Sequence, residues 1–189
     1  MSDLRAILIL ILGLWLGGSL VMGAVVSYNF AGFSDLFDRN PRLAEQAGFD
    51  PADTHAKKAS VLWVQASELN RVFFEAWNRT QLLLGVLAIA LAVWSRAGRP
   101  VLILLTLGVA LLLWIHLRIE PQLVDLGRQL DFLPRMPPPP QAGAFQRLHG
   151  LYFGAELIRL SLVLLATAIQ VTSRVSARPG LGNDQGADP

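Results

Sequence analysis

Two residues of opposite charge stand inside a stretch that is long and apolar enough to cross a bilayer. The stretch runs from Leu151 to Val171 and contains Glu156 and Arg159; about 20 apolar residues suffice for a helical span. Since a charge near the bilayer centre costs about 2.5–3.5 kcal/mol, such residues usually face the protein interior and form pairs. Their three-residue spacing places both on one helical face. The pair either neutralises itself and helps helices associate, or belongs to a ligand, proton or metal site.

The same helical face continues towards the preceding residues. Tyr152 and His149 extend it at helical spacing, so His149, Tyr152, Glu156 and Arg159 form one stripe. Histidine changes charge close to neutral pH, which makes His149 a candidate proton-responsive group. What this stripe faces depends on the helices around it.

The composition is that of a membrane protein. The chain has 189 residues, of which 53% are hydrophobic, and a mean hydropathy of +0.45, which is too apolar for an ordinary soluble domain. The net charge of +2 comes without a basic run, so we expect no nucleic-acid partner. Because cysteine is absent, disulfides, thiolate metal sites and cysteine nucleophiles are excluded. The lipid bilayer is the partner that this composition predicts.

Four apolar runs predict an all-α fold, an integral membrane four-helix bundle that fills residues 1–175. The short connection between the second and third runs makes those two helices antiparallel neighbours. The predicted spans are residues 6–28, 78–96, 100–118 and 149–172.

The first apolar run, Leu4 to Phe30, is long and rich in small residues. It exceeds the ~7–15 residues of a signal-peptide core, so we expect a retained span rather than a cleaved leader. Gly13 and Gly17 have the small-xxx-small spacing that lets a second helix approach closely. Ser19 and Gly23 repeat this spacing. The alternative is that glycine is simply common in membrane helices.

The region between the first two spans, residues 31–77, predicts a polar loop followed by an amphipathic helix outside the lipid. Residues 31–56 are polar and irregular. Asp50 is the expected N-cap of the amphipathic helix and Pro51 its first residue. An amphipathic helix that runs directly into a span is typical of the membrane interface.

The region after the third span is interrupted by prolines. Pro121 should kink or end the helix near Glu120, and a leucine repeat beyond it predicts an amphipathic continuation. Residues 134–143 form a proline-rich connector, which we interpret as a stiff spacer. Residues 176–189 are poor in large apolar side chains and are expected to be disordered.

Arginine is unevenly distributed over the predicted loops. The N-terminus, the short turn and the start of the tail hold arginines with few acidic neighbours: Arg5, Arg96, Arg99, Arg174 and Arg178. The positive-inside rule places these segments in the cytoplasm. Arginine also far outnumbers lysine, which fits a GC-rich bacterial genome. We therefore expect a multi-pass protein of a bacterial inner membrane, with both termini cytoplasmic and the long loops periplasmic.

Counting the helical rise from these arginines brings polar residues of three spans to a similar depth. His116 lies about 26 Å above Arg99 at about 1.5 Å per residue. The residues near this height form a candidate polar layer: Glu75, Asn78, Arg79, His116, Glu156 and Arg159. The layer is a small-solute or proton site, a metal or haem site, or a set of ordinary snorkelling side chains at helix ends.

His116 and His149 are the candidate metal ligands in this layer and above it. They lie roughly two helical turns apart in depth. Neither has a metal-site spacing such as His-x3-His. The difference in depth disfavours a haem site, because a haem held between two histidines needs both at the same depth.

Several motifs resemble those of one family of four-helix membrane proteins. They are LWLGGSLVMG in the first span, SELNRVFFEAW, RIEPQLVDL, and FQRLHGL with Phe145 and His149. They are similar to motifs of the transmembrane-protein-205-like family and of bacterial domains of unknown function that share its domain. Family members tend to carry proline where the first span ends, where this chain has Asn29 and Phe30. The resemblance covers about residues 8–172 and implies a four-span integral membrane protein. The positions that would form a shared site are Asn70, Arg71 and His149.

The predicted function is that of a non-enzymatic membrane protein. It would bind or move a small solute, or assist another membrane complex, without a cofactor. One alternative is a metal- or haem-binding redox subunit that uses His116 and His149. Another is a structural assembly subunit whose interface is the glycine face of the first span. A hydrolase is least favoured because no Gly-x-Ser-x-Gly elbow is present, and a bundle of this size is expected to form homo-oligomers.

Overall fold

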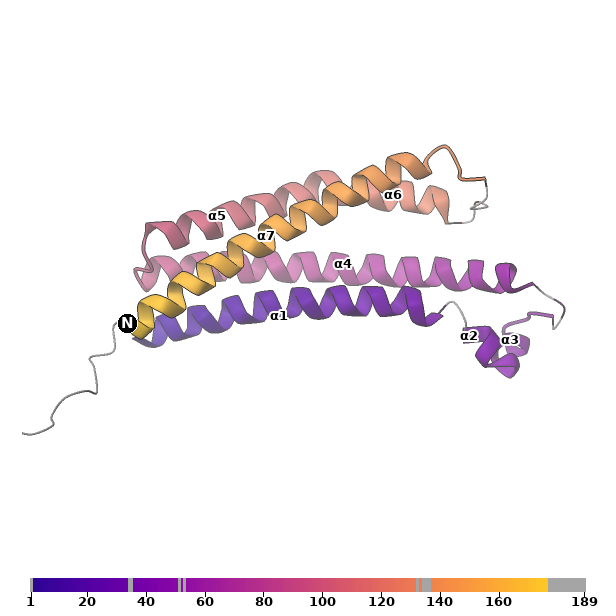
Figure 1. The fold of residues 1–189 in the computed structure, drawn as a ribbon, viewed down its shortest axis with the longest axis horizontal. Coiled ribbons are helices and arrows are strands. Elements are labelled where there is room, and N and C mark those ends of the chain that lie inside the picture. Colours follow the sequence, from indigo (N-terminus) through magenta and orange to yellow (C-terminus); the bar gives the residue numbers. More distant parts are fainter. Residues whose placement is uncertain are drawn as a thin grey trace, which may run out of the picture.

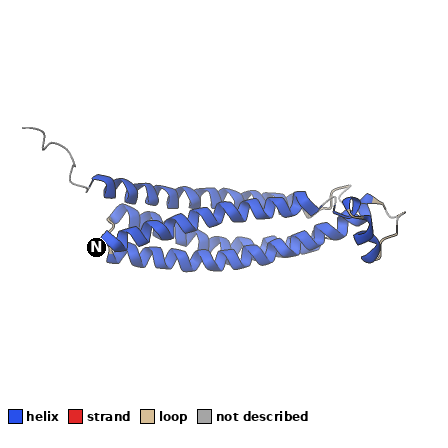
Figure 2. Cartoon of the chain, turned by 90° about the horizontal axis from the view of Figure 1, so that it is seen from below, coloured by secondary structure: helices blue, strands red, loops and turns tan. Residues whose placement is uncertain are grey.

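The computed structural model describes residues 2–33, 36–50, 52, 54–131, 133 and 137–176, and all regular structure in that part of the chain is helical (Figure 1, Figure 2). The predicted tail beyond residue 176 lies outside the described residues. The long helices are α1 (Ser2–Phe33), α4 (His55–Trp94), α5 (Arg99–Trp114) and α7 (Ala142–Ser176), and the shorter ones are α2 (Leu36–Arg39), α3 (Pro41–Gln46), the π-helical segment η1 (Ile115–Ile119) and α6 (Glu120–Leu130).

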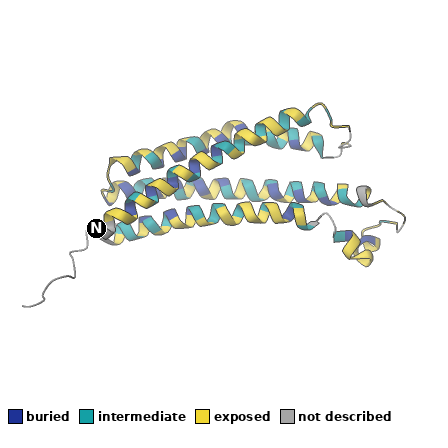
Figure 3. Cartoon of the chain, viewed as in Figure 1, coloured by how far each residue is buried: buried dark blue, intermediate teal, exposed yellow. Residues whose placement is uncertain are grey.

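Four helical stretches of the described chain are long and apolar enough to cross a membrane. They are Asp3–Gly32, Lys57–Trp94, Arg99–Leu130 and Ala142–Ser173. Large apolar side chains such as Leu20 and Leu83 are about 70% exposed, and exposed positions recur along all the long helices (Figure 3). Such surfaces suit a lipid environment, in which burial of apolar surface within the protein is not required. The prediction of an all-helical chain with four such helices is confirmed.

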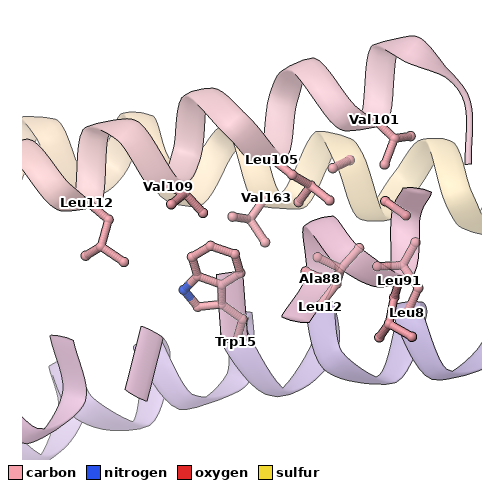
Figure 4. Close-up of a cluster of buried hydrophobic side chains, with 12 residues drawn as sticks. Leu8, Leu12, Trp15, Ala88, Leu91, Val101, Leu105, Val109, Leu112 and Val163 are labelled. Carbon is pink, nitrogen blue, oxygen red and sulfur yellow. The ribbon is translucent and has the colours of Figure 1, made fainter. Parts of the chain in front are cut away.

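The long helices pack as two pairs. Helix α1 lies along α4, and α5 lies along α7, while contacts of α4 with α5 and of α1 with α7 join the pairs. The shared core lies towards the N-terminus, where Leu12 and Trp15 of α1 are buried together with Leu105 of α5 and Val163 of α7 (Figure 4). At the opposite end, which we call the distal end, the α1–α4 pair diverges from α6 and α7 (Figure 1).

A close contact of α1 with α4 occurs at a glycine that the small-xxx-small pattern did not single out. A Cβ atom at Gly18 would collide with the indole ring of Trp77. By contrast, a Cβ atom at Gly13, Gly17 or Gly23 would meet no atom within 4 Å. Within this chain, the prediction that Gly13 and Gly17 admit a neighbouring helix is therefore wrong, because the surface of α1 that carries them faces outward.

The third long helix continues past its proline through a π-helical segment. Pro121 stands in the first turn of α6, and η1 directly precedes that turn. Proline lacks an N–H and its ring crowds the carbonyl four residues earlier; the wider π turn relieves this conflict without ending the helix. The predicted continuation is present as α6. It carries Glu120 at its start.

The segment before α4 differs from the prediction. The N-cap of α4 is Thr54, whose Oγ1 accepts a hydrogen bond from the Lys57 N–H at 3.4 Å. Asp50 instead accepts a hydrogen bond from the Ala52 N–H at 2.7 Å, which forms a local turn, and Pro51 lies outside the described residues. The predicted loop also contains helices α2 and α3. They form because the Phe37 ring packs against Phe49, with ring centroids 4.9 Å apart, which gives the segment a small core of its own.

Candidate functional site

A cavity of about 430 Å³ lies at the distal end, where the helix pairs diverge. Its walls come from α4, α6 and the first turns of α7, and Phe30 closes it from α1. Most of the residues that line it are apolar, with a few polar side chains among them. Apolar walls with a small number of placed polar groups are typical of small-molecule sites.

The proline-rich connector forms part of the cavity wall. Pro138 and Pro139 both line it. The Pro139 carbonyl also accepts a hydrogen bond from the Ala142 N–H at 2.9 Å, at the point where α7 begins. The connector was interpreted as a spacer, but its described residues cover the space between α6 and α7; Pro134 lies outside the described part of the chain.

All three positions that match the family resemblance line this cavity: Asn70, Arg71 and His149. Asn70 is only 3% exposed. Its Oδ1 accepts a hydrogen bond from Nδ2 of Asn29 at 2.8 Å, whereas its own Nδ2 is buried without a hydrogen-bond partner. Leaving a buried donor unsatisfied costs about 1–3 kcal/mol, so such a group needs an explanation.

Arg71 links α4 to the end of α6 beside the cavity. Its Nη1 and Nη2 donate hydrogen bonds to the two carboxylate oxygens of Asp131 at 2.8 and 3.1 Å. Nη1 also donates to Glu68 at 2.6 Å, and Glu68 accepts a longer hydrogen bond from Nε of Arg128 at 3.4 Å. A bidentate arginine–carboxylate pair fixes geometry as well as charge. These charges therefore neutralise one another and hold α6 against α4.

Three aromatic pairs surround the cavity, and every ring in them belongs to its lining. One pair joins α1 to α4, one joins α4 to α7, and the third lies within α7. The centroid distances are 4.7 Å for Phe30 and Trp63, 5.8 Å for Phe74 and Tyr152, and 5.8 Å for Phe145 and His149.

A chain of hydrogen bonds leads from the cavity into the bundle. It begins at Glu120, which lines the cavity and whose Oε2 accepts from Nδ2 of Asn78 at 2.8 Å. Nδ1 of His116 lies 2.7 Å from the same oxygen. Oδ1 of Asn78 accepts from Gln81 at 3.1 Å, and Oε1 of Gln81 accepts from the Trp15 indole N–H at 3.0 Å. Polar groups buried in an apolar bundle are thus satisfied by one another.

Arg159 is fully buried on the other side of Trp15. Its Nε donates to both carboxylate oxygens of Glu156, at 3.1 and 3.3 Å, and its Nη2 donates to the Ser19 hydroxyl at 3.3 Å. The guanidinium carbon lies 5.6 Å from the centre of the Trp15 ring, within the range of a cation–π contact. The pair is therefore placed inside the bundle, where Glu156 neutralises the arginine.

The candidate polar layer divides into inward and outward residues. Asn78, His116, Glu156 and Arg159 belong to the buried networks, whereas Glu75 and Arg79 form an ion pair on the outer surface of α4, with side chains 53% and 70% exposed. Depth alone could not separate them, because residues at one height can point in opposite directions around a helix. Glu120, Gln81 and Trp15 were absent from the predicted layer. For two of these residues the helical spacing in the sequence was a usable signal, because Gln81 follows Asn78 by three residues and Glu120 follows His116 by four. Trp15 lies in another helix and had no such signal.

The two candidate metal ligands have different surroundings. His116 binds Glu120, and His149 stacks on Phe145 with an interplanar angle of 15°. Across the described ranges, no three His, Cys, Asp or Glu side chains are grouped so that they could hold a metal ion. The geometry therefore gives the metal interpretation no donor set of the usual kind.

These features define a class of protein: a helical chain with four potential membrane spans, a cavity at one end and a polar network behind it. Comparisons with protein-family models, with curated protein sequences and with solved structures find no match to the chain. The resemblance to the transmembrane-protein-205-like family therefore stays a prediction. The function has to be inferred from the geometry of the cavity.

Proposed function

We propose that this is a non-enzymatic membrane protein that binds a small, mainly apolar solute in the distal cavity. The observation that carries the proposal is the cavity itself. Its volume of about 430 Å³ lies within the range of about 300–1,000 Å³ that small-molecule sites occupy. Its apolar walls supply affinity through burial of the solute, and the polar groups among them supply orientation.

The hydrogen-bonded network supports the proposal because it fixes the floor of the cavity. Glu120 is held by Asn78 and His116, and Asn78 is held in turn by Gln81. A fully connected buried network makes its members rigid. A solute in the cavity would therefore meet a preformed surface, which reduces the ordering cost of binding.

We also propose that the protein lies in a bacterial inner membrane with both termini in the cytoplasm. The end of the bundle opposite the cavity carries Arg5, Arg96 and Arg99, three of the arginines that the positive-inside rule uses. Arg5 there donates hydrogen bonds to the backbone carbonyls of Ser95 and Arg96, both at 3.4 Å, so the N-terminus and the α4–α5 turn share one end. The cavity then lies towards the periplasmic side.

The binding proposal is tested by filling the cavity. Val64 lines it, so Val64→Phe should occupy part of the volume and weaken binding of an apolar fluorescent probe such as N-phenyl-1-naphthylamine at least tenfold, which corresponds to about 1.4 kcal/mol. Binding is measured as probe fluorescence on the purified protein in lipid nanodiscs, after subtraction of empty nanodiscs.

Val61→Phe is the matched control for Val64→Phe. Val61 stands three residues earlier on α4, is 46% exposed and is not among the residues that line the cavity, so the same added ring leaves the cavity volume unchanged. This variant should bind the probe as the wild type does. Equal binding by the wild type and both variants would show that the cavity is not the binding site.

A further inference from the structure

We propose that the distal cavity takes a neutral, flat ring compound that carries a hydrogen-bond acceptor such as a carbonyl oxygen, and that Nδ2 of Asn70 is the donor to that oxygen. This inference rests on the proposed function, because it specifies the chemistry of the solute that the cavity binds. Three independent features of the cavity lead to it: the charges, the buried donor and the rings.

Among the described residues that line the cavity, Arg71 is the permanently charged cation, and its partners leave it no free position for an anion. Arg71 is already engaged by both oxygens of Asp131 and by Glu68. Glu120 is engaged by Asn78 and His116. A ligand carboxylate would have to displace one of these ion pairs and would face two protein carboxylates in an apolar site, which costs free energy without a compensating contact. A neutral ligand avoids this cost.

The buried donor of Asn70 specifies what a neutral ligand must offer. Asn70 is 3% exposed and lines the cavity, and its Nδ2 has no hydrogen-bond partner. Its Oδ1 is engaged by Asn29 at 2.8 Å, so the unused hydrogen-bonding capacity of the amide is that of a donor. Because Nδ2 is buried, a ligand oxygen reaches it when neighbouring side chains of the cavity wall move aside. A site that holds such a group discriminates in favour of ligands that satisfy it. An oxygen acceptor on the ligand fulfils this requirement.

The rings around the cavity specify the shape. The three aromatic pairs place rings of α1, α4 and α7 on its walls. Aromatic side chains pack on flat rings in offset-stacked or edge-to-face arrangements, which contribute about 0.5–1.5 kcal/mol beyond area burial in proteins. Phe30 directly follows Asn29 in α1, and Trp63 stands two helical turns before Asn70 in α4. A planar ring with an oxygen at its edge therefore combines both kinds of contact.

The test compares three probes of one size. They are 2-methyl-1,4-naphthoquinone, which has ring and acceptor; 2-methylnaphthalene, which has the ring alone; and 2-naphthoate, which is an anion. The full chain is used in lipid nanodiscs, and binding is measured by equilibrium dialysis against empty nanodiscs. The absence of cysteine from the chain prevents covalent addition of thiols to the quinone. We expect the quinone to bind most tightly, methylnaphthalene more weakly, and naphthoate no better than empty nanodiscs retain it.

Asn70→Leu identifies the donor. It should weaken quinone binding by about 3- to 10-fold, the effect of one neutral hydrogen bond, and leave methylnaphthalene binding unchanged. Asn29→Ala breaks the same Asn29–Asn70 hydrogen bond but keeps the Asn70 donor, and it should retain the preference for the quinone. This second variant separates donation to the ligand from a structural effect of the broken pair.

Each outcome decides one of the two proposals. If the quinone and methylnaphthalene lose affinity equally in Asn70→Leu, or if naphthoate binds as well as the quinone, the inference about ligand class is overturned while binding in the cavity stands. The same holds if Asn29→Ala abolishes the preference as Asn70→Leu does. If no probe binds the wild type above the empty nanodiscs, and Val64→Phe changes nothing, the proposed function itself fails.

Discussion

The guanidinium group of Arg159 is fully buried, yet a carboxylate, a hydroxyl and an indole ring surround it. Removing one member of a buried ion pair leaves an uncompensated charge and typically costs about 3–5 kcal/mol, whereas replacing both members with apolar residues is often neutral. The Glu156–Arg159 pair should therefore behave as a unit. Its two members are not independent contributors to stability.

Glu156→Leu should lower the free energy of unfolding by about 3 kcal/mol, and Glu156→Leu combined with Arg159→Leu should recover most of that loss. Thermal unfolding in detergent, followed by circular dichroism, measures both. Glu75→Leu is the control, because it breaks an ion pair on the surface of α4 and should cost less than about 1 kcal/mol. A double variant as unstable as the single one would contradict the interpretation.

The contact between α1 and α4 depends on a glycine of α1 that leaves room for a side chain of α4. Gly18 faces the indole of Trp77, whereas the space beside Gly17 is open. Two neighbouring glycines of one helix therefore differ in what a larger side chain would meet. Since both stand in the interior of α1, the change in helix propensity is the same for each, and the difference between their variants reports packing alone.

Gly18→Leu should destabilise the protein by about 1–3 kcal/mol, the typical cost of overpacking a close contact, because Trp77 would have to move. Gly17→Leu should stay within about 0.5 kcal/mol of the wild type. The midpoint of thermal unfolding in detergent gives both values. A greater loss in Gly17→Leu would indicate that a second copy of the chain or another partner covers this face of α1.

The continuous helical stretch formed by α5, η1 and α6 contributes residues to both the core and the cavity. The π-helical segment η1 carries His116, and α6 begins with Glu120. Helical spacing brings their side chains together at 2.7 Å, and Glu120 also lines the cavity. A straight helix ending at Pro121 would have supplied neither the far wall of the cavity nor the Asp131 carboxylate that binds Arg71.

At the scale of the whole molecule, the helix pairs are joined at the N-terminal end and divergent at the distal end (Figure 1). The cavity follows from this divergence. If the bundle spans a membrane as proposed, the cavity and α3 face the periplasm, and the last turn of α7 faces the cytoplasm. This arrangement can be tested directly, because the chain has no cysteine of its own.

Single-cysteine variants should report opposite sides of the membrane. Glu45→Cys in α3 should react with a membrane-impermeant maleimide in intact bacterial cells, whereas Ser173→Cys near the end of α7 should react only after lysis. Both positions are exposed, so accessibility within the protein does not limit labelling. Labelling is read as a gel shift. The reverse pattern would place the termini outside, and equal labelling of both sites in intact cells would contradict a transmembrane arrangement.

Hydropathy predicted four long apolar helices because a helix satisfies its own backbone hydrogen bonds within each segment, and this much needed no tertiary information. The boundaries were less accurate around prolines. Asp50 and Pro51 have the sequence signature of a helix start, yet α4 begins after Thr54. At Pro121, by contrast, the predicted continuation is present as α6, and what the sequence did not indicate is the π turn before the proline. Near a proline, more than one residue can begin or end a helix, and the packing of the neighbouring segments decides which one does.

The sequence by itself determined the class of the chain: its apolar length, its helical periodicity, and the pairing of Glu156 with Arg159, which share a helical face at any tertiary arrangement. Only the tertiary structure decided which polar residues meet. The rotation of each helix turned Glu75 and Arg79 outward and brought Trp15, Gln81 and Asn78 together. The divergence of two helix pairs then created the cavity, because the relative rotation and tilt of packed helices depend on contacts between residues far apart in the chain.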